Sequence, residues 1–136
     1  MVPKQAKKEG EELPLISNHS IVPLPGLVVP IHLKDKAAIA AVKEALEADQ
    51  RIVLALQSGP ENEKPSEENI SKVAGLGLIV QSVEYSNTEM QVRLHIQSRV
   101  SISEFLSFSP FISVMGHEHH EDKHIKISTR EEKLIK

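Results

Sequence analysis

Cysteine is absent from this 136-residue chain, which excludes disulfide bonds, thiolate zinc sites and cysteine nucleophiles. Tryptophan is absent too, and the aromatic side chains are one tyrosine and three phenylalanines. The core must therefore be built from valine, isoleucine, leucine and alanine. A chain without cysteine agrees with a reducing compartment, and we expect a cytoplasmic protein.

Long apolar runs and a basic face are lacking as well. No segment approaches the ~20 apolar residues of a membrane helix, and the charged start MVPKQAKKEGEE does not resemble a signal peptide. The net charge is −3, with lysine and arginine scattered among acidic residues. Nucleic-acid-binding proteins usually carry a basic face that neutralises phosphates. We therefore expect neither a membrane nor a nucleic acid as a partner.

Length and composition indicate one globular domain. The chain is 40% hydrophobic and 26% charged, which is ordinary for a globular protein. Residues 1–12 are polar and aperiodic, which predicts a disordered arm. Residues 13–116 form the predicted domain. Residues 117–136 are rich in histidine and charge, and we expect a polar tail or the start of a truncated helix.

Hydrophobic periodicity predicts a mostly β fold of the α+β class. Residues 35–49 repeat apolar side chains at helical spacing, with Asp35 as the expected N-cap. Three prolines within residues 21–33 exclude a buried helix there and predict an extended, edge-like strand. Apolar runs and alternation predict further strands over 51–57, 76–85, 90–102 and 111–115. We expect a barrel-like domain of about six short strands with one main amphipathic helix.

Four of the seven histidines lie among acidic residues in the segment GHEHHEDKH (116–124): His117, His119, His120 and His124. On a strand the first two would share a face, and on a helix the last two would lie one turn apart. A neighbouring acid would have to supply the third ligand of a zinc site. The alternative, which we favour, is a solvated polar segment whose imidazoles bind divalent metal only weakly and adventitiously. A further reading is pH sensitivity, because the imidazoles gain positive charge as the pH falls toward 5. We expect no metal and no other cofactor.

Signatures of the common enzyme classes are missing from the sequence. The segment GLGLIV (75–80) contains Gly-x-Gly, but it leads into a predicted strand and lacks the third glycine of a dinucleotide site. There is no P-loop motif. No serine or acid is placed by the sequence to form a triad with His19, His32 or His95. We therefore expect a chain that is not itself an enzyme and has no catalytic or cofactor-binding residues.

The three phenylalanines, Phe105, Phe108 and Phe111, recur at intervals of three residues. This spacing fits a helical stripe, and it also fits a loop that folds inward. We favour packing into the core, because aromatic side chains are highly buried on average. If the rings were exposed, they would form an apolar patch able to bind unfolded chains.

The segment LPGLVVPIHLKDKAAIAAVKEALEADQRIVLALQ (24–57) resembles the amino-terminal domain of the ATP-dependent protease Lon. The resemblance lies in an ordered succession: Pro25, Pro30, an apolar strand, a helix ending at Asp49, and a second apolar strand closed by Gln57. It continues through VAGLGLIVQSV and MQVRLHIQSRVSI, and it reaches Ile102. These residues would shape the fold and not a catalytic site, and the resemblance rests on the order in which they occur.

The resemblance implies a PUA-like pseudo-barrel that recognises unfolded or damaged protein substrates and supports assembly of the hexameric protease. It implies no catalysis here, because the ATPase and serine–lysine protease domains of that family lie elsewhere in a much longer chain. The chain would be either a fragment of such a protease or a free-standing relative. Candidate protein-binding residues are the apolar side chains of the proline-rich strand and the phenylalanines: Leu24, Leu27, Val29, Phe105, Phe108 and Phe111.

Two alternatives belong to other classes. One is a free-standing adaptor or a metal- or pH-responsive sensor that uses the histidine-rich tail. The other is an RNA-binding barrel, which the net charge of −3 and the shortage of stacking aromatics oppose.

Overall fold

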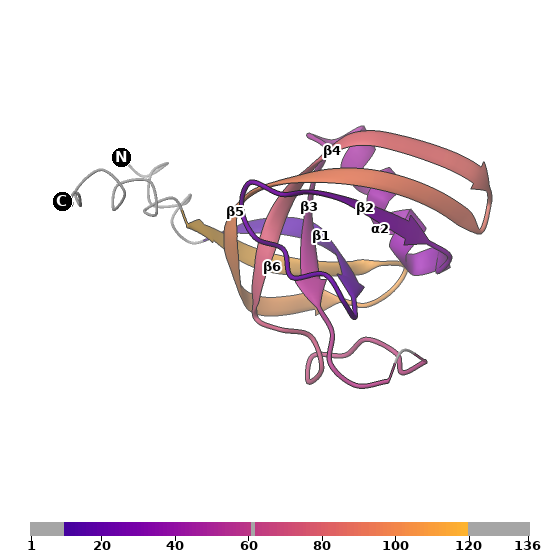
Figure 1. Ribbon diagram of the computed structural model, residues 1–136. Coiled ribbons are helices and arrows are strands. Elements are labelled where there is room, and N and C mark those ends of the chain that lie inside the picture. Colours follow the sequence, from indigo (N-terminus) through magenta and orange to yellow (C-terminus); the bar gives the residue numbers. More distant parts are fainter. Residues whose placement is uncertain (1–9, 61, 120–136) are drawn as a thin grey trace.

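The computed structural model describes residues 10–60 and 62–119, which form a strongly curved sheet with one helix (Figure 1). The elements follow one another in this order: β1 (Glu11–Asn18), β2 (Val28–Leu33), α2 (Lys36–Glu47), β3 (Arg51–Leu56), β4 (Val73–Ser86), β5 (Glu89–Ser107) and β6 (Ile112–His119). The predicted mostly β fold with one main helix is thus confirmed.

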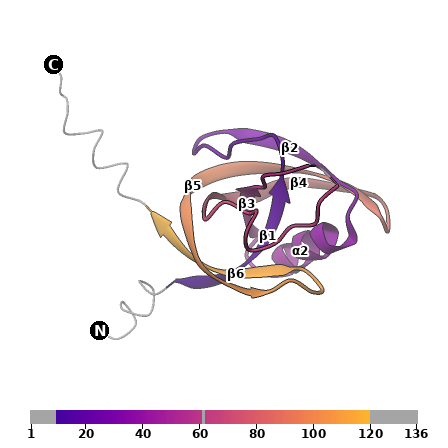
Figure 2. The same ribbon diagram turned by 90° about the horizontal axis from the view of Figure 1, so that it is seen from below.

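The sheet closes on itself through its longest strand. The strand order is β2-β5-β4-β3-β1-β6, and β5 also pairs with β6, so β5, β4, β3, β1 and β6 form a ring. β5 has 19 residues, and it pairs with β2 through residues 90–95 and with β6 through residues 99–107. All pairings are antiparallel except β1 with β3. Figure 2 shows the curvature of β5 around the barrel.

The extended strand predicted over residues 21–33 forms from Val28 onward as β2, so Pro30 lies on an edge strand whereas Pro23 and Pro25 lie in the loop before it. β2 is the first strand of the sheet order, and its burial alternates residue by residue. Pro30 points outward with His32, while Ile31 points into the core. An edge strand tolerates a proline because it needs hydrogen bonds on one side only.

The helix α2 begins at the predicted N-cap. A side-chain oxygen of Asp35 accepts a hydrogen bond from the Ala38 backbone N–H at 3.3 Å. The buried face of α2 contributes Ile39 and Val42 to one of two apolar clusters, together with side chains of β2, β4 and β5. The second cluster lies among β1, β3, β4, β5 and β6. The strands of the ring therefore bury aliphatic side chains, as the composition required.

The strands extend beyond the expected domain bounds of residues 13 and 116. β1 begins at Glu11, because Glu11 and Glu12 pair with Gly116 and Met115 of β6. β6 runs on to His119, because β5 pairs with it as far as Arg99. Backbone pairing thus brings polar residues into the first and last strands, and the domain bounds themselves stay a prediction. The remainder of the expected arm and tail, residues 1–9 and 120–136, lies outside the described residues.

Candidate functional site

A tight turn before β2 presents two of the predicted binding residues. The Leu27 N–H donates to the Leu24 carbonyl at 3.2 Å, which closes a four-residue turn with Pro25 and Gly26 at its centre. Gly26 has a φ of 96°, the left-handed conformation that a type II turn requires at this position. The Gly26 N–H also donates to the Ile96 carbonyl of β5 at 2.8 Å. The turn is therefore fastened to the sheet.

Four apolar side chains are exposed in and around this turn. We call Val22, Leu24, Leu27 and Val28 the turn surface, and each is between 42% and 53% exposed. Between the first two, Pro23 is buried. Pro23 packs against Gly75 of β4 so closely that a Cβ placed on Gly75 would lie 2.7 Å from the Pro23 Cβ. The turn surface is thus apolar and exposed, and the packing of Pro23 against β4 anchors it to the sheet.

Val29, a third predicted binding residue, lies on the opposite face of β2. Its side chain is 6% exposed and belongs to the core cluster that includes Ile31 and Leu33. Successive side chains of a strand point to opposite faces, so Val28 and Val29 cannot both be exposed on this edge. The structure therefore places Val29 in the core and not beside the exposed Val28.

The phenylalanines do not form a helical stripe, because β5 continues to Ser107 and a turn follows it. The rings of Phe105 and Phe108 are stacked, with centroids 5.6 Å apart and an angle of 11° between their planes. Phe105 packs against the second apolar cluster and Phe111 against the first. Phe108 remains 40% exposed. The expected core packing therefore applies to two rings, and the third is available at the surface.

The structure does not bring the two predicted binding regions together. Both views place the loop before β2 and the β5–β6 turn on different sides of the barrel (Figures 1 and 2). The β5–β6 turn lies near the start of α2, whereas the loop before β2 lies beside the middle of β5, to which it is hydrogen-bonded at Ile96. A short peptide would therefore contact one region or the other.

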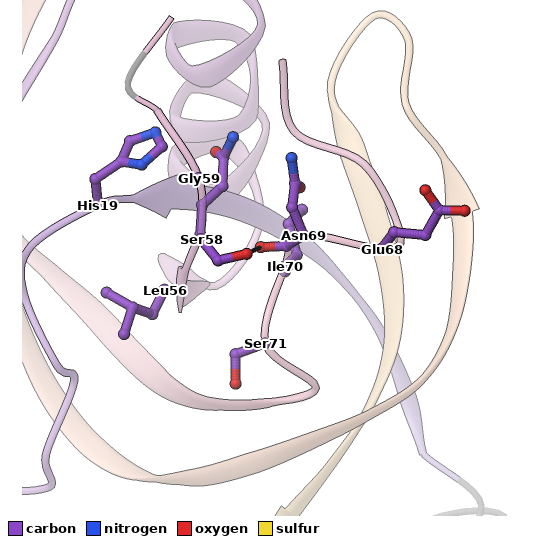
Figure 3. Close-up of a pocket in the computed structure, with 9 residues that line it drawn as sticks. His19, Leu56, Ser58, Gly59, Glu68, Asn69, Ile70 and Ser71 are labelled. Atoms are coloured by element: carbon purple, nitrogen blue, oxygen red, sulfur yellow. Dashed lines mark hydrogen bonds between the residues drawn. The ribbon is translucent and has the colours of Figure 1, made fainter. Parts of the chain in front are cut away.

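Two hollows that the sequence did not predict lie around residues 57–71. One, of about 570 Å³, runs from the start of α2 to Phe108, between β1 and residues 62–65. The other, of about 420 Å³, is lined by His19, Leu56, Asn69 and their neighbours (Figure 3). His19 lines both, and its Nδ1 is buried without a hydrogen-bond partner among the described residues. No spacing in the sequence signals these hollows, because they join segments far apart in the chain.

Arg51 connects the beginning of β3 to β1. Its Nε donates to Asp49 Oδ2 at 2.7 Å, and its guanidinium also pairs with Glu11. Burial raises the pKa of the Asp49 carboxyl, but the hydrogen bonds and positive charge of Arg51 outweigh it and hold this pKa below its ordinary value. This group is a structural link between two strands of the ring.

The first two histidines of the predicted cluster lie side by side on β6. His117 Nε2 is 3.1 Å from Ser103 Oγ, and His119 Nε2 is 2.6 Å from Ser101 Oγ. Within residues 10–60 and 62–119, no group of three or more histidine, aspartate or glutamate side chains could hold a metal ion. His120 and His124 lie outside the described residues, so the expectation that this segment holds no functional metal site stays a prediction. No helix in the described part of the chain is long and apolar enough to cross a membrane.

A ring of strands with an anchored apolar turn and an exposed phenylalanine has the features of a protein-binding domain. Residues 12–136 match the family described as the ATP-dependent protease La (LON) substrate-binding domain, and the chain belongs to this family. The resemblance inferred from the sequence is thereby confirmed.

The relatives are much longer proteins. The chain is 30% identical over 105 residues to the Lon protease of Aster yellows witches'-broom phytoplasma, covering 76% of this chain and 13% of that protein. It is 28% identical over 117 residues to Lon protease 1 of Syntrophobacter fumaroxidans, covering 85% and 14%. The chain therefore spans about one seventh of the length of these relatives.

Two solved structures share the fold. The N-terminal domain of a Mycobacterium avium complex Lon protease superposes with a TM-score of 0.58 at 22% identity, covering 82% of this chain and 56% of that one. A Lon N-terminal domain protein from Xanthomonas campestris gives a TM-score of 0.61 at 14% identity, covering 81% and 60%. At these identities the likeness establishes the architecture alone.

Proposed function

We propose that this chain is a non-catalytic module that binds apolar segments of unfolded or damaged proteins. The observation that carries the proposal is the turn surface, four exposed apolar side chains on an anchored loop. Apolar contact is non-directional, and it contributes about 25 cal/mol for each Å² removed from water. Such contact suits clients that share exposed hydrophobic side chains but no sequence. Membership of a substrate-binding family supports the same role.

The setting we propose is that of an ATP-dependent protease in the cytoplasm. The curated relatives are Lon proteases, and the chain corresponds to a small part of their length. In such a protease this module would hold a client while other domains unfold and cleave it. Self-association of the module would support assembly of the hexamer. The net charge of −3 opposes nucleic acid as a partner.

The turn surface is tested by reversing its polarity. We expect the double variant Leu24→Lys, Leu27→Lys to bind a reduced and carboxymethylated, permanently unfolded protein about thirtyfold more weakly, because each leucine loses apolar contact worth about 1 kcal/mol. Fluorescence anisotropy of the labelled unfolded protein measures the affinity. Val73→Lys is the matched control, because Val73 is exposed but lies outside the turn surface.

The single variant Phe108→Lys compares the second region. If the turn surface is the main site, Phe108→Lys retains most of the affinity and the double variant does not. Equal binding by the double variant and the unchanged protein would contradict the proposal. A loss in Phe108→Lys alone would move the site to the β5–β6 turn.

A further inference from the structure

The sheet has an open edge along the second half of β4. β3 pairs with β4 only at residues 75–78, opposite Arg51–Leu54. The Ile79 N–H then donates to the Gln50 carbonyl at 2.8 Å. Beyond Ile79, residues Gln81–Glu84 and Ser86 of β4 pair with β5 on one side, and no described residue forms a backbone pair with them on the other. The Glu84 side chain forms an ion pair with Lys43 of α2 at 3.0 Å. Figure 1 shows this part of β4 along the outer margin of the sheet.

The side chains along this edge are exposed, and three of them are large and apolar or aromatic. All seven residues from Val80 to Ser86 are exposed, with Val80, Val83 and Tyr85 between 40% and 57%. Tyr85 is held in place, since its hydroxyl lies 3.2 Å from Gln91 Oε1. An uncovered edge with exposed apolar side chains is unusual, because other strands can add to it.

The regular part of the edge is short. Register shifts between Ile79 and Gln81 and between Glu84 and Ser86 interrupt the pairing with β5. Only Gln81–Glu84 remain as an uninterrupted run. Bulges twist a strand and end regular pairing, so this edge can accept a short segment but cannot template an extended sheet.

We propose that the open edge of β4 at Gln81–Glu84 binds an extended apolar segment of an unfolded protein as an added strand. This inference rests on the proposed function and names the form in which the client binds. Only an extended backbone matches the alternating N–H and carbonyl groups of a sheet edge, and this match requires no particular side chains. Val83 and Tyr85 add a preference for apolar clients. The short run makes the contact weak and reversible, as a client that must be passed on requires.

The first test compares a probe peptide that has backbone N–H donors with a partner peptide that lacks them. The probe is an eight-residue peptide of alternating valine and threonine with a lysine at each end, and its partner is the same peptide methylated on every backbone nitrogen. We expect the first peptide to slow amide hydrogen exchange of the outward-facing residues of Gln81–Glu84 at least tenfold in the 136-residue chain, measured by NMR. The methylated peptide keeps its side chains and is expected to give no slowing.

A pair of variants provides the second test. Neighbouring residues of a strand point their N–H groups to opposite sides, so one of Ser82 and Val83 donates toward β5 and the other points outward. Replacing the residue that donates toward β5 by proline removes a hydrogen bond of the sheet and lowers the Tm. Replacing the residue whose N–H points outward removes only a donor of the open edge and keeps the Tm. This variant is expected to bind the unmethylated peptide about threefold or more weakly. Retention of full affinity by the Tm-neutral variant would overturn the inference.

The remaining outcomes separate the inference from the proposed function. If the peptide shifts resonances of the turn surface and leaves exchange at Gln81–Glu84 unchanged, strand addition is wrong and the proposed function stands. If neither the peptide nor the unfolded protein binds, both fail. If the amides are already protected in the free chain and lose protection on dilution, a second copy of the chain occupies the edge, which also overturns the inference.

Discussion

Replacement of Gly75 by alanine tests how the turn surface is anchored. A Cβ on Gly75 would lie 2.7 Å from the Pro23 Cβ, 3.0 Å from the Pro23 carbonyl oxygen and 3.0 Å from the Ile96 Cγ2. Carbon atoms in contact are normally about 3.5–4.0 Å apart. Because Pro23 and the backbone of β4 are both rigid, the new methyl group must push the segment that carries Leu24 and Leu27 away from the sheet.

Overpacking a buried site costs about 1–3 kcal/mol. For a domain of this size, about 4 °C of Tm is lost for each kcal/mol, so the clash in Gly75→Ala by itself corresponds to a loss of about 4–12 °C. The same substitution stiffens the unfolded chain, which offsets about 0.4–1 kcal/mol of the loss. Displacement of the turn is also expected to weaken binding of the unfolded protein.

Gly77→Ala is the matched control. Gly77 is a buried residue of the same strand, and a Cβ there would meet Leu94 Cβ at 3.3 Å and Ile96 Cδ1 at 3.4 Å, which are side-chain atoms. The gain from the unfolded chain is the same in both variants, so the difference between them reports the closer contacts at Gly75, of which the one with Pro23 is the shortest. Thermal unfolding followed by circular dichroism measures it. If Gly75→Ala is as stable as Gly77→Ala and binds as well, the anchoring argument is refuted.

Three further predictions concern the frame of the barrel. Asp35→Ala removes the N-cap of α2 and is expected to lower the free energy of unfolding by about 1 kcal/mol in urea titrations, whereas Lys36→Ala is neutral. Leu54→Ala opens a cavity at a fully buried position of β3, and a loss of about 2–5 kcal/mol is expected by the same measurement. The folded pKa of Asp49 lies below its ordinary value, so its contribution to stability is complete above the unfolded pKa of about 3.9 and is lost as the pH falls through the folded pKa. Urea midpoints of Asp49→Asn from pH 6 to pH 3 should therefore fall less steeply than those of the unchanged chain; parallel curves would contradict this.

Local patterns were sufficient to predict most of the elements. Helical spacing after Asp35 located α2 to within two residues at each end, and the prolines of residues 21–33 identified an edge strand. β1 was missed because Pro14 interrupts its pattern and its partners, β3 and β6, come from distant parts of the chain. Long-range pairing of this kind leaves no local signal.

The candidate site was predictable only in part. Leu24 and Leu27 are exposed, whereas the strand alternation that turns His32 outward assigns Val29 to the core. The open edge of β4 was not predictable, because it exists only where β3 ends before β4 does. Exposure along a sheet depends on how far the neighbouring strand reaches, which no single segment encodes.

The pairing of Glu11 with Gly116 has a mechanical consequence. The described chain enters the barrel at the start of β1 and leaves it at the end of β6, and these two strands are antiparallel neighbours. A pull between the two ends therefore loads the backbone bonds of this pair one after another, beginning at Glu11. Tension would peel β1 from β6 before it reached β2 or β4. If the turn surface binds a client as proposed, the client would stay attached while the domain was stretched at its ends.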